Sequence, residues 1–190
     1  MTASNADCPT LYTIGHSNHG WDNFVSIVQS HGITAVADVR SSPYSRFNPQ
    51  FNRESMAHEF GRAGVSYVFL GVELGARRSE PECYSGRCAR YDLIERSPLF
   101  QAGLQRLRAG LERHRIALLC AEKNPITCHR MILVCRALRG DAIRIEHILD
   151  DGSLESTRDA ETRLLAATGM PESDLFLDRE ALVEEAYRRQ

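Results

Sequence analysis

The sequence predicts a three-layer α/β fold, in which a mostly parallel, five-stranded, Rossmann-like sheet carries helices on both faces and is followed by C-terminal helices. Short apolar runs that suit strands alternate with longer amphipathic runs that suit helices. This alternation is typical of a parallel sheet that is covered on both faces. The run over residues 33–39 is apolar on both faces, as a buried parallel strand is. The length of 190 residues and the hydrophobic content of 43% suit one domain with a core.

Glycine and polar residues separate the predicted elements. The strands are predicted over residues 11–14, 33–39, 65–70, 116–120 and 143–148. The helices between them are predicted over residues 21–31, 53–63, 99–114 and 127–139. Gly32, Gly64 and Gly140 follow three of these helices and stop them, while Asn52 caps the second. Residues 71–91 are expected to be irregular.

The last two of these helices differ in character. The helix over residues 99–114 is amphipathic, because apolar residues recur at helical spacing at Phe100, Leu104, Leu107 and Leu111. The helix over residues 127–139 is apolar nearly all round its first half, so we expect it to be buried. From about Ser156, two further helices centre on Leu164 and Ala181. We therefore divide the chain into a flexible N-terminus (1–9), an α/β domain (10–150) and a helical extension packed on the same domain (151–190).

Composition limits the possible partners. The formal net charge of -2 gives no overall attraction to nucleic acid or to an anionic membrane. No apolar run approaches the roughly 18 residues that a membrane helix needs, and Met1 to Pro9 lacks the apolar region of a signal peptide. We expect a cytoplasmic protein without a membrane partner, whose six cysteines are reduced.

Four polar segments each follow the carboxyl end of a predicted strand, where parallel α/β sheets bind ligands. We therefore expect His16, Asp38 and Cys120 to lie in one cleft. The first segment comprises residues 15–19. Gly15 permits a tight turn, Ser17 can accept hydrogen bonds from free backbone N–H groups at the helix start, and His16 is a candidate base or ligand. The alternative is an ordinary helix cap with an exposed histidine.

The second segment runs from Asp38 to Arg46. Asp38 ends a buried strand and needs a partner such as Arg40 or His16 to offset its desolvation. Arginine binds phosphate or carboxylate through a planar fork, which suits Arg40 and Arg46. Aromatic side chains here could stack on a base or ring, namely those of Tyr44, Phe47 and Phe51. The alternative is a solvated loop held by an Asp–Arg pair.

The third segment, residues 71–78, is a weaker indication. Gly71 and Gly75 frame a glutamate, and Arg77 follows as a further anion-binding candidate. Such glycines are as often plain turn residues. Cys83 and Cys88 come next, but a zinc site needs a tighter pair and two more ligands.

The fourth segment, residues 120–130, carries the most chemistry. With Thr127 as a helix cap, Cys128, His129 and Arg130 fall in the first helical turn, where free N–H groups and the helix dipole favour an anion and lower a thiol pKa. These ingredients loosely resemble those of cysteine-dependent phosphatases and sulfurtransferases, although Cys120 and Arg130 lie further apart. Alternatively, Cys120 is a small buried hydrophobe, and His129 and Arg130 serve as cap and surface charge.

The same segment could bind metal, because Cys120, Glu122, Cys128 and His129 are suitable donors for zinc or iron. Consecutive residues of a helix, however, point about 100° apart. Cys128 and His129 could then not easily hold one ion, and a metal would use one of them with His16. We therefore assign no metal ligands, and the cofactor stays open.

Together these segments resemble a known family. The residues that carry the resemblance are Thr13-Ile14-Gly15-His16-Ser17, Asp38-Val39-Arg40 with Pro43 and Ser45-Arg46, Leu74-Gly75 with Arg77, Cys120-Ala121-Glu122 and Cys128-His129-Arg130. The chain, over about residues 11–150, is similar to the prokaryotic domain of unknown function 488 family. The resemblance implies a compact α/β domain of a bacterial or archaeal cytoplasm and no particular reaction.

The leading hypothesis is an enzyme, a cysteine- and histidine-dependent hydrolase or transferase, that acts on an anionic substrate such as a nucleotide or a phosphorylated or carboxylated metabolite. Cys120 or Cys128 would be the nucleophile, and a proton would move through His16, Glu122 or His129. The substrate would be bound by Ser17, Asp38, Arg40, Tyr44, Arg46, Arg77 and Arg130. The alternatives are a nucleic-acid-binding module and a metal- or haem-binding protein. The oligomeric state stays open.

Overall fold

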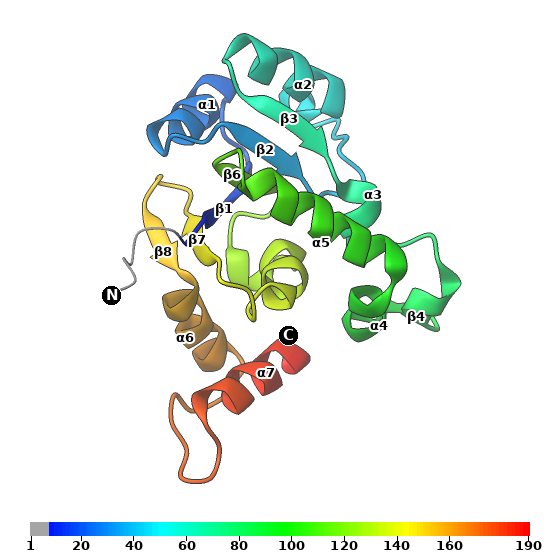
Figure 1. The fold of residues 1–190 in the computed structure, drawn as a ribbon, viewed down its shortest axis with the longest axis vertical. Helices are drawn as coiled ribbons and strands as arrows, with labels where there is room; N and C mark the ends of the chain where they lie inside the picture. The colour runs from blue at the N-terminus through cyan, green and yellow to red at the C-terminus, as the bar shows by residue number, and fades with distance from the viewer. Residues whose placement is uncertain (1–7) are drawn as a thin grey trace, which may run out of the picture.

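The computed structural model describes residues 8–190, and its centre is a six-stranded sheet (Figure 1). The strand order is β3-β2-β6-β1-β7-β8. The strands are β1 (Thr10–Gly15), β2 (Ala35–Asp38), β3 (Ser66–Phe69), β6 (Ile116–Cys120), β7 (Arg144–Ile148) and β8 (Leu154–Ser156). The first five pair in parallel, and β8 is antiparallel to β7. The α/β class and the mostly parallel sheet are confirmed.

The sheet has one strand more than predicted. β8 follows a tight turn in which Gly152 has a φ of 82°, and it returns along β7. It is only three residues long and begins with an exposed leucine, Leu154. Because it forms no apolar run and adds only an edge, the sequence pattern does not reveal it.

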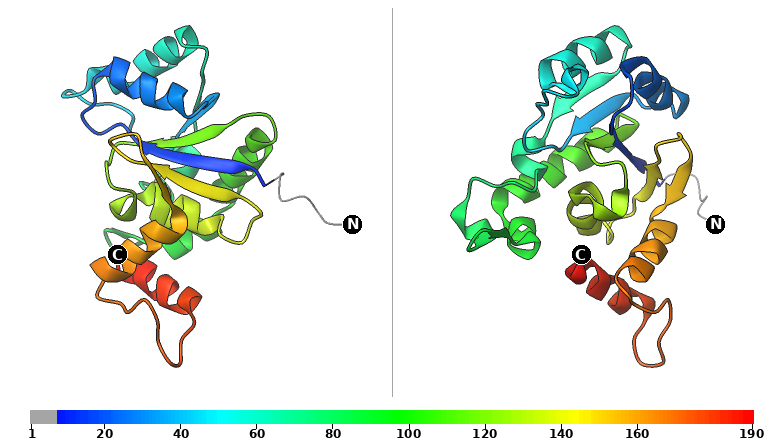
Figure 2. Two further views of the ribbon diagram at one scale, coloured as in Figure 1. Left: turned by 90° about the vertical axis from the view of Figure 1, so that its left-hand side faces the viewer. Right: turned by 180° about the vertical axis from the view of Figure 1, so that it is seen from behind.

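Helices cover both faces of the sheet (Figure 2). The helices α1 (Trp21–Ser30) and α2 (Arg53–Arg62) pack on one face, where their buried side chains join alternate residues of the strands. The helix α5 (Pro98–Leu111) and the π-helical segment η4 (Arg130–Cys135) pack on the other face. The three layers therefore each contribute to the core.

The switch point of the sheet lies at its centre. β1 and β2 lead to helices on one face, whereas β6, which lies between them, leads to η4 on the other. In open α/β sheets the loops separate at such a point, and a crevice opens outside the carboxyl ends of the strands. The loops after β1, β2 and β6 are three of the four polar segments singled out above.

The C-terminal helices α6 (Thr157–Ala167) and α7 (Arg179–Arg189) pack together against the outer side of η4. Their shared apolar cluster includes Met131 and Ile132. Figures 1 and 2 show them at the end of the molecule opposite α2. Within residues 8–190, the structure has no helix that combines the length and apolarity needed to cross a membrane.

Residues 1–7 of the predicted flexible N-terminus lie outside the described part of the chain. Cys8 and Pro9 are described and contact the start of β7. The amide of Arg144 donates to the carbonyl of Pro9 over 2.9 Å, and the Cys8 thiol donates to the carbonyl of Ala142 over 3.0 Å. These two residues are therefore attached to the sheet.

The stretch predicted as irregular, residues 71–91, contains several short elements. They are α3 (Gly71–Leu74), η2 (Pro81–Cys83), β4 (Tyr84–Ser85), β5 (Cys88–Ala89) and the start of α4 (Tyr91–Arg96). β4 and β5 form a separate two-stranded sheet. A further short turn of 3₁₀-helix, η1 (Pro49–Phe51), precedes α2. Elements of two to six residues lack the periodicity by which a sequence reveals a strand or helix.

The most consequential difference concerns the predicted helix over residues 127–139. A 3₁₀ turn, η3 (Pro125–Thr127), comes first, and Cys128 after it is extended, with φ −117° and ψ 137°. The carbonyl of Cys128 accepts from the amides of Met131 and Ile132. Cys128 therefore occupies the helix cap that was predicted for Thr127. The π-helical stretch that follows is a form often found at functional sites.

Candidate functional site

A cavity of about 410 Å³ lies outside the carboxyl ends of β2 and β6. Its lining residues come from loops far apart in the sequence: Arg40, Ser41, Ser42, Tyr44, Ala76, Arg77, Tyr91, Cys120, Ala121, Glu122, Thr127 and His129. Three of the four polar segments thus contribute directly. No residue of the first segment, residues 15–19, lines the cavity, but His16 contacts the lining residue Arg40 from the side away from the cavity.

Two glycines allow the loops of the site to approach each other closely. A Cβ atom on Gly15 would lie 1.9 Å from the carbonyl oxygen of Glu122. A Cβ atom on Gly75 would lie 2.3 Å from the carbonyl oxygen of Gly71 and 2.4 Å from the Ser41 hydroxyl. Glycine is the residue that permits such backbone contact. The glycines that looked like ordinary turn signals therefore bring the polar segments together.

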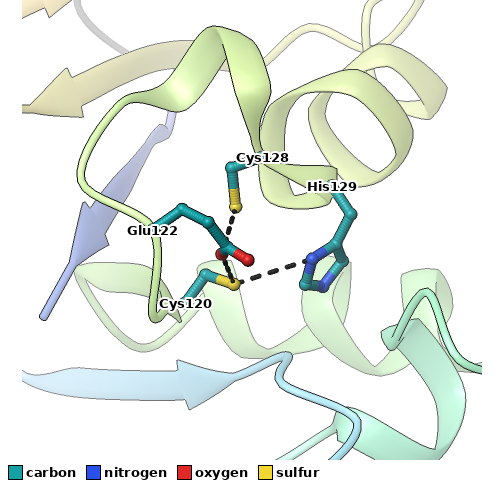
Figure 3. A group of neighbouring side chains, drawn as sticks. All are labelled: Cys120, Glu122, Cys128 and His129. Carbon is teal, nitrogen blue, oxygen red and sulfur yellow. Dashed lines mark hydrogen bonds between the residues drawn. The ribbon is translucent and has the colours of Figure 1, made fainter. Parts of the chain in front are cut away.

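Two thiols, a carboxylate and an imidazole form the inner wall of the cavity and the layer beneath it (Figure 3). The thiols of Cys120 and Cys128 both donate to the Glu122 Oε2 atom, over 2.6 and 3.1 Å. The Cys120 Sγ atom lies 3.6 Å from His129 Nδ1. One donor atom from each of the four residues lies within 4.8 Å of the others. We call these four residues the Cys-Glu-Cys-His cluster.

The backbone conformation of Cys128 makes this cluster possible. If Cys128 and His129 both lay within a regular helix, their side chains would point about 100° apart. Because Cys128 is extended and His129 is the first helical residue, the side chains converge instead. The expectation that they could not easily hold one ion rested on the misplaced helix start, and its assumption of diverging side chains is wrong.

His129 is held in one orientation by the neighbouring strand end. Its Nε2 atom lies 2.9 Å from the carbonyl oxygen of Val39, and this contact places a proton on Nε2. The Nδ1 lone pair then faces the Cys120 thiol. Burial acts to lower the pKa of His129, but the nearby sulfur of Cys128, the carbonyl of Val39 and the negative charge of Glu122 outweigh burial and raise that pKa overall.

The electrostatics of the cluster differ from those predicted for a reactive thiol. Burial raises the pKa of the Cys128 thiol well above its ordinary value. Burial also acts to raise the pKa of Glu122, but the hydrogen bonds from Cys120 and Cys128 outweigh it and lower that pKa to about 2. The pair of thiols therefore surrounds a negative carboxylate. The helix start does not produce a Cys128 thiolate, because burial and the neighbouring Cys120 keep the pKa of this thiol raised.

The pair formed by Asp38 and Arg40 is buried behind the cavity. Arg40 donates to both carboxylate oxygens of Asp38, over 2.9 Å from Nε and 2.6 Å from Nη2. The hydroxyl of Tyr67 donates to the same carboxylate over 2.6 Å. Asp38 is fully buried, and these partners offset its desolvation. Arg40 thus presents only part of its guanidinium to the cavity.

His16 completes this buried chain rather than opening on the cavity. Its Nδ1 atom donates to the carbonyl of Ser17 over 2.9 Å, and its Nε2 atom accepts from Arg40 Nη1 over 3.0 Å. The ring also stacks on Phe51, with centroids 4.3 Å apart. Burial, followed by the charge of Arg40, lowers the pKa of His16 to about 4. Both ring nitrogens are therefore engaged, and His16 orients Arg40.

Arg130 is fully buried and contacts backbone rather than the cavity. It donates to the carbonyl oxygens of Glu122 over 2.5 Å and Lys123 over 3.1 Å, and to the Thr13 hydroxyl over 3.4 Å. These contacts tie the loop after β6 to η4 and β1. Arg130 therefore holds the loop that carries Glu122 in place.

Two other predicted binding residues lie outside the cavity wall. Ser17 has a φ of 48°, a conformation that non-glycine residues seldom adopt, and its hydroxyl donates to Asn18. Arg46 is exposed beyond Tyr44. Tyr91 and the serines at 41 and 42 also line the cavity and were not assigned individually as binding residues from the sequence. The serines lie inside a segment already singled out, whereas no sequence pattern marks Tyr91.

The fold and the site together define a class of protein: a parallel α/β domain with a thiol-, carboxylate- and imidazole-bearing cavity at its switch point. Residues 20–137 match the model of the family described as Domain of unknown function DUF488, and the chain belongs to that family. The match covers the second, third and fourth polar segments and begins after His16. Comparison with curated proteins and with solved structures found no match.

Proposed function

We propose that the chain is an enzyme, a hydrolase or transferase, that acts on an anionic small molecule in the 410 Å³ cavity. The observation that carries the proposal is that one cavity joins a wall of hydrogen-bond donors and arginine to the Cys-Glu-Cys-His cluster. A ligand held by the hydrogen-bond donors and the arginine would place its reacting atom against the Cys-Glu-Cys-His cluster. We also propose the Rossmann-like assignment of the sheet and a cytoplasmic, prokaryotic setting.

The anion-binding wall is formed by the loops after β2 and α3. Arg77 is exposed, and its backbone amide donates to the Ser41 hydroxyl over 2.9 Å, which joins the two loops. Within residues 8–190, the amides of Ser41, Ser42 and Ala76 donate to no protein acceptor. Clustered free amides together with a guanidinium suit phosphate or carboxylate oxygens. Arg40 adds the part of its guanidinium that faces the cavity.

The reacting wall is formed by Cys120, Glu122 and His129, the three members of the cluster that line the cavity. His129 Nδ1 and the Glu122 carboxylate are placed to take or return a proton at the Cys120 side of the cavity. Val39 orients the imidazole, as the third group of a catalytic constellation does. Both thiols are buried, but Cys120 lines the cavity and Cys128 does not, so we propose Cys120 rather than Cys128 as the nucleophile.

The experiment measures binding of inorganic phosphate and of pyrophosphate by calorimetry. Arg77→Ala should weaken binding about ten- to a hundredfold, since a charge-assisted hydrogen bond contributes about 1.5–3 kcal/mol. Arg77→Lys should restore part of the loss, because an ammonium lacks the planar fork. Arg113→Ala is the matched control, since Arg113 is exposed near the amino end of β6, at the opposite edge of the sheet. Equal affinity in wild type, Arg77→Ala and Arg113→Ala would remove the anion wall from the proposal.

A second candidate function is nucleic-acid binding, and the loop after β2 favours it. Phe47 is 93% exposed and Tyr44 56%, and Arg46 lies between them. Exposed aromatics beside arginine can stack on unpaired bases. Binding of a single-stranded oligonucleotide that falls with rising salt and is lost in Phe47→Ala would support this candidate over a small-molecule substrate.

A further inference from the structure

We infer that the Cys-Glu-Cys-His cluster is a binding site for one transition-metal ion, with zinc as the ion best matched to its donors. Two thiolates, an imidazole and a carboxylate form a donor set that zinc accepts, and soft sulfur ligands disfavour magnesium and calcium. This inference deepens the proposed function, on which its catalytic part rests. The binding of the ion itself stands on the cluster alone.

The separations of the donor atoms fit one ion. In a tetrahedral site with metal–ligand bonds of ~2.0–2.3 Å, neighbouring donor atoms lie about 3.3–3.8 Å apart. Here the three contacts measured within the cluster are 2.6, 3.1 and 3.6 Å, and all four donor atoms lie within 4.8 Å of one another. Shifts of about an ångström in side-chain position would give the tetrahedron. All four donors come from residues 120–129, which are the last residue of β6 and the loop that follows it up to the start of η4.

The surroundings orient the donors as the outer shell of a metal site does. A histidine that binds metal through one nitrogen commonly donates its other N–H to a carbonyl or carboxylate. His129 has this arrangement, because Nε2 faces the carbonyl of Val39 and Nδ1 faces the cluster. Arg130 and Gly15 contact the carbonyl oxygen of Glu122 from the other side. The loop that carries three of the donors is therefore held from behind.

The negative charge of Glu122 in the cluster also has no cationic side chain as its partner within residues 8–190. Within residues 8–190, no lysine or arginine side chain donates to either sulfur or to the Glu122 carboxylate. Arg40, the neighbouring cation, is already paired with Asp38. The two thiols instead donate to Glu122. A divalent ion would replace the two thiol protons, which would be released. The two sulfurs and Glu122, which are now joined by hydrogen bonds, would then all coordinate the ion.

The position of the cluster indicates what the ion would contact. Cys120, Glu122 and His129 line the cavity, whereas Cys128 lies beneath them. A bound ion would therefore lie beside the cavity rather than enclosed in the core, although four protein donors already fill a tetrahedral zinc site. The anion wall with Arg77 faces the same space. If the proposed function holds, the ion would act there as a Lewis acid on a phosphate or carboxylate oxygen bound as a fifth ligand. In that metal-loaded form, Glu122 and His129 would hold the ion instead of moving a proton.

The test is metal binding by the full chain, with Zn²⁺ and with Co²⁺ as a coloured substitute. We expect one ion per chain and, with Co²⁺, the charge-transfer absorption of cobalt bound to thiolate. Cys128→Ser should weaken binding by on the order of 100-fold or more, because even outer-shell changes cost metal sites about 10–100-fold. Its hydroxyl can still donate to Glu122, so the fold should be kept. Cys8→Ser is the matched control, since Cys8 is exposed near the amino end of β7.

A second measurement covers the case in which Cys128→Ser does not fold. In the wild-type chain, Zn²⁺ should slow the reaction of Cys120 with a maleimide, as followed by mass spectrometry, while the exposed Cys88 reacts at an unchanged rate. Absence of thiolate–cobalt absorption, or equal protection of Cys88 and Cys120, would overturn the inference. The same absorption in folded Cys128→Ser as in wild type would overturn it too.

Failure of this inference can be distinguished from failure of the proposed function. Phosphate binding is measured both in chelator-treated and in Zn²⁺-loaded protein. Arg77-dependent phosphate binding without any metal binding would refute the metal site and leave the anion wall supported. Metal binding of the expected kind without phosphate binding in either form would support the metal site and refute the anionic substrate.

Discussion

Replacing Arg130 by alanine should destabilise the fold, because its buried guanidinium ties the loop after β6 to the core. The side chain is fully buried and donates to the carbonyl oxygens of Glu122 and Lys123, over 2.5 and 3.1 Å. A hydrogen bond from a charged donor contributes about 1.5–3 kcal/mol. At the lower end of that range, the loss of both bonds costs about 3 kcal/mol.

For a chain of this size, each kcal/mol lowers the melting temperature by about 2–4 °C. Arg130→Ala should therefore melt about 6–12 °C below wild type in a thermal scan followed by circular dichroism. Arg130→Lys should fall between the two, since an ammonium can reach one carbonyl but lacks the fork. The control is Arg62→Ala. Arg62 is largely exposed and pairs only with Glu59 along its own helix, so its loss should change stability by about 0.5 kcal/mol or less.

The competing interpretation is the one that the sequence favours, in which Arg130 binds the anion. It forecasts the opposite result: an unchanged melting temperature with phosphate affinity reduced about tenfold or more. That outcome would refute the scaffold role derived from these contacts. Lost stability with phosphate binding kept, under conditions where the variant is folded, would support it.

Two further predictions concern the residues that place the site. Gly15→Ala should cost about 2 kcal/mol or more, because the new Cβ atom would lie 1.9 Å from the Glu122 carbonyl oxygen. Gly61→Ala in α2 has open space at its Cβ position and should instead raise the melting temperature, so equal behaviour of the two variants would contradict the close approach. The folded-state pKa of His16, about 4, lies below its ordinary value of 6.5, so the unfolded chain binds more protons at this position between those values. The contribution of neutral His16 is complete above about pH 6.5 and is lost as the pH falls toward 4. Between pH 7 and pH 5 the loss should amount to about 2 kcal/mol. Urea unfolding at pH 7 and pH 5 should show this loss reduced in His16→Gln and unchanged in a variant of the exposed His114, whereas an NMR titration of His16 centred near 6.5 would refute it.

The local patterns of the chain account for much of the fold. Alternation of apolar and amphipathic runs placed the five parallel strands and the main helices within a few residues of their observed bounds. Such patterns succeed because burial on a sheet face or helix face constrains residue type at regular spacing. They failed at β8 and at the short elements of residues 71–91, where too few residues repeat for any spacing to show.

The location of the candidate site was also predictable, since Arg40, Cys120 and His129 follow strand ends and parallel strand ends meet at one edge. The partners of each side chain were not. Whether Arg130 binds a ligand or the Glu122 loop depends on how the loop after β6 lies over Gly15, more than 100 residues earlier in the chain. Likewise, the extended backbone of Cys128 follows from a 3₁₀ turn in front of it, and a helix-cap pattern alone places it one residue too late in the helix.

By itself, then, the sequence determined the α/β class, the family and the edge of the sheet that carries the polar residues, because these depend on patterns within single segments. The tertiary structure alone decided that two thiols, Glu122 and His129 share one small volume, that His16 supports Arg40, and that Arg130 is buried. These features depend on contacts between segments far apart in the chain, and on whether a residue such as Cys128 has an extended or a helical backbone.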